Sequence, residues 1–247
     1  RTERLETGET ALLKGKDRNK DQSYFLFEVK DGDLSRLLFP LGNLTKEEVK
    51  ALGNQFELPV SDKESQEICF IPDNDYTGFI RDYCGSPGCP LAGEFKVLDR
   101  EGPVWHRDGT LLGRHQGLYR YTIGQRKGLG IAHSRPLYVL ELRKDSNSLI
   151  LGYREDTFSG SLEASELNWI AGEAPAMPCE VEVKIRSNHR RTRGRIRPVV
   201  TGSGQDGVKV EFDRPQSAVT PGQAAVFYLG DRVLGGGWIE RGFPVGG

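Results

Sequence analysis

A dense run of cationic side chains is the first feature of this sequence with a possible chemical use. Residues 184–197 hold seven lysines and arginines and one histidine, with no acidic residue among them: Lys184, Arg186, His189, Arg190, Arg191, Arg193, Arg195 and Arg197. The arginines at every second position from 191 to 197 would share one side of a strand. Such a strip attracts a phosphate backbone, while a solvated hairpin of charged residues is the alternative.

A second basic segment is punctuated by glycines. Residues 122–131 read TIGQRKGLGI. The pair Gly128 and Gly130 lacks the third glycine and the following helical pattern of a dinucleotide-binding loop, so a tight turn between strands is the favoured interpretation. Arg126 and Lys127 could still hold a phosphate at such a turn.

The four cysteines offer thiol chemistry. They are too few and too scattered for a disulfide framework, so reduced thiols are expected. Cys69 stands between the polar stretch 64–67 and an apolar run, but cysteines are often buried and inert, which leaves its role open. Cys84 and Cys89 could form half of a zinc site. Neither Cys179 nor the scattered histidines supply a second pair at motif spacing, so zinc is not predicted.

Local patterns indicate the elements that must position these groups. A capping box at Thr45 and Glu48 begins a helix whose apolar face extends to Phe56. Asp75 can cap a second helix, which carries Tyr76, Phe79, Ile80 and Tyr83 on one stripe and ends in the segment 84–90. Seven short strands are predicted, at residues 10–14, 137–142, 148–152, 180–185, 208–212, 224–228 and, by alternation, 94–98. Residues 118–122 are also predicted to be extended. Short strands between frequent turns favour one or two small β-barrels.

Length and charge limit the function classes. The chain has 247 residues, enough for one large domain or two to three small ones, and a formal net charge of −1. A balanced charge gives no overall attraction to polyanions, so any nucleic-acid site must be local. No apolar run reaches the length of a membrane span, and the beginning of the chain has no signal-peptide core. A cytoplasmic protein without membrane contact is therefore expected.

Six colinear motifs together resemble the tRNA-specific 2-thiouridylases. They occur in that family's order and spacing over essentially the whole chain, at residues 19–26, 38–42, 64–71, 122–131, 218–223 and 234–237. The resemblance implies an enzyme that thiolates the wobble uridine of tRNA at position 2, using ATP to adenylate O2 and a protein persulfide to supply sulfur.

The resemblance also implies roles for individual residues. Cys69 matches the cysteine that carries the persulfide, and a thiolate is suited to that chemistry. The remaining positions match contacts with tRNA, near a uridine flipped out of its stack or along the RNA backbone. They are Lys20, Asp21, Gln22, Arg186, Ser187 and Gln223, to which Arg190 and, in the central domain, Arg126 and Lys127 are added as phosphate ligands.

Two family motifs do not occur in this sequence. These are the Ser-Gly-Gly-x-Asp-Ser loop that cradles ATP phosphates and an Asp-x-x-Cys whose cysteine releases sulfur by forming a disulfide. The chain alone is therefore expected to be inactive, with its ATP site largely outside it. An iron–sulfur cluster is an alternative cofactor, for which Cys69 would be a ligand. The expected partners are tRNA and a persulfide-carrying sulfur-relay protein, and a monomer is expected.

The expected fold class is α+β and rich in β-structure, in three parts. Residues 1–72 are expected to be the end of an α/β ATP pyrophosphatase domain, residues 73–155 a small central domain, and residues 156–247 an antiparallel β-barrel that binds tRNA. The alternative function is a tRNA-docking module with no catalysis of its own, which works with a separate ATP domain.

Overall fold

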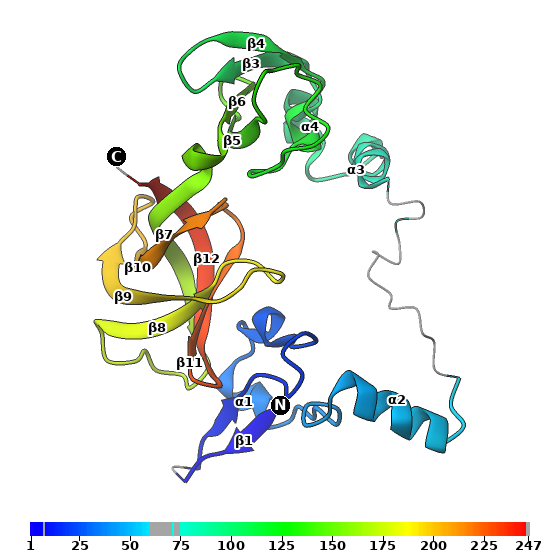
Figure 1. The fold of residues 1–247 in the computed structure, drawn as a ribbon, viewed down its shortest axis with the longest axis vertical. Helices are drawn as coiled ribbons and strands as arrows, with labels where there is room; N and C mark the ends of the chain where they lie inside the picture. Colours follow the sequence, from blue (N-terminus) through cyan, green and yellow to red (C-terminus); the bar gives the residue numbers. More distant parts are fainter. Residues whose placement is uncertain (7, 60–70, 72–74, 246–247) are drawn as a thin grey trace. The chain divides into compact units, whose positions relative to one another are not determined.

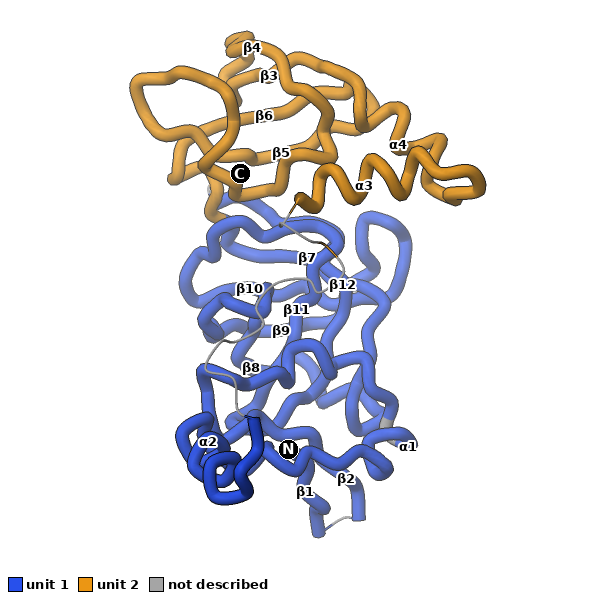
Figure 2. Tube along the Cα trace, turned by 90° about the vertical axis from the view of Figure 1, so that its right-hand side faces the viewer, with its two compact units in different colours: residues 1–60, 159–247 blue, residues 61–158 orange. Residues whose placement is uncertain are grey.

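Figure 1 shows the chain in a computed structural model, which describes residues 1–6, 8–59, 71 and 75–245. The chain forms two compact units (Figure 2). The first combines Arg1–Val60 with Ser159–Gly247, and the second is Ser61–Phe158. Segments far apart in the sequence therefore fold together in the first unit.

The C-terminal part of the first unit is a closed barrel of six strands in the order β10-β7-β12-β11-β8-β9 (Figure 1). The strands are β7 (Phe158–Trp169), β8 (Cys179–Lys184), β9 (Thr192–Val200), β10 (Asp206–Ser217), β11 (Ala224–Leu229) and β12 (Arg232–Pro244). Alternate side chains fill the interior, where Leu162, Val183, Ile196, Val210 and Phe227 are fully buried. Closure pairs the strands all the way round, which removes the open edges of a flat sheet.

Strand β11 is buried on both faces. Phe227 points into the barrel core, whereas Val226 and Tyr228 belong to a second apolar cluster on the outside of the barrel. This explains why residues 224–228 read as a continuous apolar run instead of an alternating one, since a strand covered on both sides has no solvent face.

The outer layer comes from residues 1–59. It contains a hairpin of β1 (Thr2–Arg4) and β2 (Thr10–Leu12), the short helices η1 (Ser23–Leu26) and α1 (Asp31–Leu34), and helix α2 (Lys46–Gln55). Leu12, Tyr24, Phe27 and Leu34 are buried against the outside of β11 and β12. The segment therefore depends on the barrel for its core.

Three consecutive glycines at residues 235–237 let this layer approach β12 closely. A Cβ on Gly236 would lie 2.7 Å from the Phe27 ring, and one on Gly235 would lie 2.1 Å from the Asn168 carbonyl oxygen. The Asn168 side chain in turn donates to the carbonyl oxygens of Phe27, at 2.6 Å, and Val29, at 3.1 Å. The glycines at 235–237 therefore allow Phe27 and the backbone of Asn168 to pack directly against β12.

The second unit is built on a four-stranded sheet in the order β4-β3-β6-β5. Its strands are β3 (Gly102–His106), β4 (Leu111–His115), β5 (Tyr138–Arg143) and β6 (Ser148–Gly152), and its helices are α3 (Tyr76–Gly85), α4 (Ala92–Leu98), η3 (Leu118–Arg120) and η4 (Arg154–Thr157). Strands β3 and β6 are parallel, and the other pairs are antiparallel. Val104, Val139, Leu149 and Leu151 are fully buried in the core.

The predicted helix starts are confirmed. The Thr45 hydroxyl accepts from the Glu48 amide at 3.3 Å while the Glu48 carboxylate accepts from the Thr45 amide at 2.6 Å, and Asp75 caps α3. The apolar faces of these two helices are not buried along their whole length, since Phe56 after α2 and Tyr83 on α3 are 65% and 53% exposed.

Two predicted extended segments are wrong. Residues 94–98 form α4 and residues 118–122 begin with the turn η3. In α4 Phe95 is buried and Val97 is 42% exposed, while Leu98 packs against the core. Burial at a spacing of three residues is helical, whereas a strand would have buried Phe95 and Val97 together. The strands predicted at 137–142, 148–152, 180–185, 208–212 and 224–228 are present within a residue or two at their ends, or inside a longer strand.

The α+β, β-rich fold class with a C-terminal antiparallel barrel is confirmed. Within the described residues, no helix is both long and apolar enough to cross a membrane.

Candidate functional site

Asp21 lies at the centre of a tightly folded loop, residues 15–23. Its carboxylate accepts from the amides of Gly15 and Ser23, at 3.0 and 3.1 Å, and from the Ser23 hydroxyl at 3.0 Å. The Asp21 side chain is only 4% exposed, whereas its neighbours Lys20 and Gln22 are exposed. Asp21 therefore shapes the loop, and the residues on either side of it face outward.

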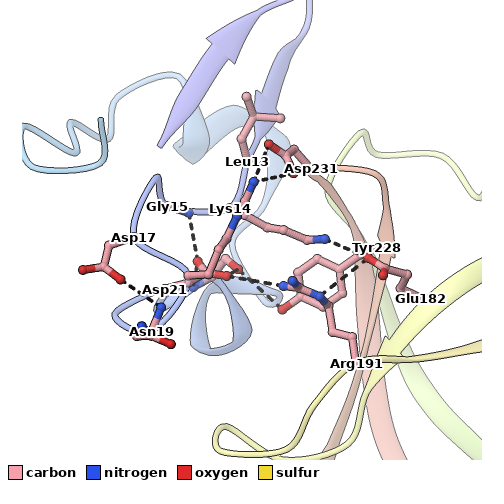
Figure 3. Close-up of polar contacts among 12 residues, drawn as sticks. Leu13, Lys14, Gly15, Asp17, Asn19, Asp21, Glu182, Arg191, Tyr228 and Asp231 are labelled. Atoms are coloured by element: carbon pink, nitrogen blue, oxygen red, sulfur yellow. Dashed lines mark hydrogen bonds and ion pairs between the residues drawn. The ribbon is translucent and has the colours of Figure 1, made fainter. Parts of the chain in front are cut away.

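A polar cluster joins this loop to the barrel (Figure 3). We define the loop anchor as Lys14, Asp21, Glu182, Arg191 and Tyr228. The Lys14 ammonium donates to Glu182 at 2.8 Å and lies 5.0 Å from the centre of the Tyr228 ring. The Arg191 guanidinium lies 5.5 Å from the same ring, 3.6 Å from Glu182 and 3.8 Å from Asp21. Two cations thus flank one buried ring, and both contact one carboxylate.

Burial sets the ionisation of the anchor's phenol. Tyr228 is fully buried, which raises its pKa to about 12, although a 3.4 Å contact with the Ser23 hydroxyl acts in the opposite direction. The phenol is therefore neutral at physiological pH and serves as a hydrogen-bonding and packing group.

Tyr24 connects the loop to two other predicted tRNA-binding segments. Its hydroxyl donates to the Ala224 carbonyl oxygen at 3.1 Å, next to Gln223. The Lys184 ammonium lies 5.7 Å from the centre of the Tyr24 ring, and burial lowers the pKa of Lys184. The structure therefore brings Tyr24 against Lys184 at the end of β8 and against Ala224 at the start of β11, close in the sequence to Arg186 and Gln223.

Arg186 is bound to the turn that precedes Gln223. Its guanidinium donates to the Ala218 carbonyl oxygen at 2.9 Å and to the Thr220 hydroxyl at 2.5 Å. Burial lowers the pKa of Arg186, which keeps its charge because an ordinary guanidinium titrates far above neutral pH. Arg190 and Gln223 are exposed, and Ser187 is half-buried.

His189, next to Arg190 in the sequence, contains a buried polar atom. Its Nδ1 atom is buried with no hydrogen-bond partner among the described residues. Burial lowers the pKa of His189, and the nearby charges of Arg186 and Lys184 lower it further. The imidazole is therefore held in its neutral form near neutral pH.

The arginine strip has no acidic residue within it, but two of its arginines are paired with glutamates from neighbouring strands. The alternation on β9 does place its arginines on the outer face of the barrel, but neighbouring strands bring glutamates to them. Arg195 lies 3.6 Å from Glu180 on β8, and Arg197 lies 3.4 Å from Glu211 on β10. These partners are about fifteen positions away in the sequence, so a window along residues 184–197 could not include them.

The segment 122–131 forms the expected tight turn in the second unit. Gly124, Gly128 and Gly130 all have positive φ angles, and the Gln125 side chain accepts from the Thr122 amide and donates to the Lys127 carbonyl oxygen, each at 2.9 Å. The side chains of Arg126 and Lys127 are exposed. They belong to a different unit from the surface around Tyr24.

The cysteines divide into two groups. Cys69, the predicted persulfide carrier, lies outside the described residues. Cys84, Cys89 and Cys179 are not in disulfides, and burial raises the pKa of the Cys84 and Cys179 thiols. Among the described residues, no three His, Cys, Asp or Glu side chains are placed to hold a metal ion.

Sequence reasoning missed three members of the loop anchor, namely Lys14, Glu182 and Tyr228. The one available signal was Lys14, a lysine that directly follows the apolar residues 11–13. Its side chain is 3% exposed, and a lysine is rarely so buried unless it has a partner.

Three domain families match the chain in succession. They are the tRNA methyl transferase HUP domain at residues 1–73, the tRNA methyl transferase PRC-barrel domain at residues 94–153, and the aminomethyltransferase beta-barrel domain at residues 159–239. The first and third both lie mainly in the first compact unit.

Several similar proteins bear the name tRNA-specific 2-thiouridylase MnmA. The one from Solibacter usitatus is 45% identical over 237 residues, which cover 95% of this chain and 62% of that protein. MnmA 2 from Syntrophus aciditrophicus is 44% identical over 257 residues, which cover 97% of this chain and 72% of that protein. The protein from Geotalea uraniireducens is 47% identical over 242 residues, which cover 98% of this chain and 60% of that protein. The chain thus spans between about three fifths and three quarters of these relatives, and it belongs to the tRNA-specific 2-thiouridylase family.

Proposed function

We propose that this chain is the tRNA-binding and sulfur-delivering part of a cytoplasmic enzyme that replaces O2 of the wobble uridine of tRNA with sulfur. The observation that supports this most directly is a chain of contacts between three predicted tRNA-binding segments. Tyr24 contacts Lys184 and Ala224, and Arg186 binds Ala218 and Thr220. The motifs in these segments are far apart in the sequence, and a shared surface is what one RNA ligand requires.

The exposed groups on this surface suit a flipped pyrimidine and its backbone. The Gln22 amide can both donate to and accept from a uracil edge, and Gln223 offers the same chemistry. Lys20 and Arg190 can bind phosphates, which fixes the orientation of the RNA without reading its sequence. Arg186 and Ser187 complete this surface, with Arg186 also holding the turn before Gln223. In the second unit, Arg126 and Lys127 add phosphate ligands.

Cys69 supplies the sulfur in this proposal. The terminal sulfur of a persulfide on Cys69 would attack C2 of the uridine adenylated at O2, and AMP would leave with that oxygen, so that this sulfur becomes the new exocyclic atom. Breaking the sulfur–sulfur bond then takes two electrons from a second thiol, which forms a disulfide with Cys69. A thiol reductant would then have to reduce this disulfide before a persulfide-carrying protein reloads the Cys69 thiol. The chain would act as a monomer.

The described residues do not fit ATP. Binding of its phosphates calls for a glycine-rich loop that opens a helix, but glycines 235–237 lie within strand β12 and the loop at 124–130 leads to strand β5. We therefore assign the adenylation of uridine to the portion of the relatives that this chain does not cover. The described residues do not form an iron–sulfur site either, and no step is assigned to a cluster.

A docking module without catalysis is the second candidate, favoured by the lack of an ATP site in the described residues. One experiment distinguishes the two candidate functions. The chain is incubated with tRNA, ATP and a persulfide donor, with and without the N-terminal portion of a relative, and 2-thiouridine is measured by mass spectrometry. Product that requires both parts supports the proposal. If the combined parts bind tRNA but yield no product, the chain is a docking module; if the chain does not bind tRNA, both candidates fail.

Replacing Arg190 with alanine is expected to weaken tRNA binding and to reduce the slope of log K against log salt by about one unit, because one phosphate contact is lost. Arg190 is a better probe than Arg186, whose removal would also release the turn before Gln223. Arg197→Ala is the matched control, since Glu211 already pairs with that charge. Equal slopes for wild type and Arg190→Ala would remove Arg190 from the RNA contacts.

A further inference from the structure

Arg191 is set apart from the other arginines of the strip by its direction. Its side chain is 25% exposed, against 57% for Arg195 and 45% for Arg197. Whereas those two pair with single glutamates on adjacent strands, Arg191 faces Asp21 in the 15–23 loop as well as Glu182. We propose that Arg191 is a positioning residue that fixes the 15–23 loop against the barrel and thereby sets where Lys20 and Gln22 meet the RNA.

The contacts run from the barrel to the middle of the loop without a gap. Lys14 holds Glu182 at 2.8 Å, and Glu182 lies beside Arg191. Arg191 then faces the same Asp21 carboxylate that accepts from Gly15 and Ser23. Both arms of the loop are therefore tied to one carboxylate. Arg191 forms an ion pair with that carboxylate from the barrel, and the charge of Lys184 on β8 also acts on it.

Tyr228, on β11 of the barrel, provides a second contact between the barrel and the 15–23 loop. Its ring lies under the Arg191 guanidinium and its hydroxyl is 3.4 Å from that of Ser23. Because Tyr228 is fully buried between the barrel and the outer layer, it cannot follow the loop if the loop shifts. Arg191, directly before β9, and Tyr228, on β11, thus restrain the loop from the barrel, as preorganised binding sites require.

The restraint on Asp21 also affects the RNA contacts of the loop, an inference that rests on the proposed function. Asp21 stands between Lys20 and Gln22, so any displacement of its carboxylate moves both neighbours. A misplacement of about 1 Å is enough to impair a directional interaction. Arg191 would therefore affect discrimination between bases more than overall attraction to RNA.

The first readout does not require RNA. Trypsin cleaves after Lys20, and release of the loop should raise the rate of cleavage at this bond about tenfold in Arg191→Ala, because local opening sets the rate. Arg191→Lys keeps the charge but cannot contact Asp21 and Glu182 together, so it should give an intermediate rate. Arg195→Ala, with the same change of charge four positions further along on β9, should match wild type. A wild-type cleavage rate in Arg191→Ala, with its melting temperature unchanged, would overturn the proposal.

The second readout separates positioning from general stability. Anticodon stem-loops with uridine or cytidine at the wobble position are compared for binding to the full chain. In Arg191→Ala the preference for uridine should fall about tenfold, with partial recovery in Arg191→Lys, while cytidine RNA should bind within about twofold of wild type. An equal loss of affinity for both RNAs would show a merely structural role and overturn positioning.

Asp21→Asn covers the case in which Arg191→Ala does not fold. The amide oxygen of asparagine can still accept from Gly15 and Ser23, but the charge facing Arg191 is lost. Faster cleavage after Lys20 is expected here too, and no change in the rate would contradict the anchor. If wild type shows no uridine preference, the proposed base reading fails, whereas the cleavage experiment still decides the anchor.

Discussion

Replacing Lys14 with methionine is expected to destabilise the first unit by about 2–3 kcal/mol. The Lys14 side chain is 3% exposed, and its ammonium donates to Glu182 and to the Gly230 carbonyl oxygen. Methionine occupies similar space but donates nothing, so Glu182 keeps only its longer contact with Arg191. Because Glu182 is 40% exposed, water compensates in part, which places the cost below that of a fully buried broken pair.

Urea unfolding followed by tryptophan fluorescence measures this cost. A Trp105→Phe background leaves Trp169 and Trp238, both in the first unit, as the reporters. Lys16→Met is the control: its ion pair with Glu48 has a short 2.7 Å contact, but both side chains are more than 40% exposed, so no measurable change is expected. If Lys14→Met does not change the urea concentration at the midpoint of unfolding, the loop anchor does not stabilise the first unit.

Replacing Cys69 with serine is expected to abolish persulfide loading and leave tRNA affinity unchanged. Serine has nearly the same shape but a hydroxyl that cannot hold a second sulfur, so the proposed carrier is removed without a change of charge or size. Loading is measured by incubating the chain with a persulfide donor and counting the added sulfur by intact mass.

Two other thiols serve as controls for the Cys69 experiment. Burial raises the pKa of Cys84 and Cys179, so both are protonated near neutral pH and react slowly. Cys84→Ser and Cys179→Ser should therefore load sulfur like wild type. Undiminished loading of Cys69→Ser would assign the persulfide to another cysteine, and a large loss of tRNA affinity would contradict a role limited to sulfur transfer.

Local patterns were reliable wherever neighbours in the sequence are also neighbours in space. The capping box at Thr45 and the cap at Asp75 are formed as predicted. Of the four alternating arginines, Arg193, Arg195 and Arg197 do share the outer face of β9, whereas Arg191 lies before the strand and faces Asp21. By contrast, residues 94–98 contain Phe95, Val97 and Leu98, a pattern that alternation and a helical turn fit equally well, and only packing against the core selected the helix.

By itself, the sequence determined the family, through six motifs in order, and the presence of a β-rich fold. Only the tertiary structure decided what the charged residues do. It paired Arg195 and Arg197 with glutamates on neighbouring strands, and it buried Asp21 against Arg191, which gives this residue a part in shaping its own loop. The physical reason is that barrel closure and the outer layer bring together side chains up to 230 positions apart, as in the ion pair of Arg1 with Asp231, and electrostatic partners depend on distance in space.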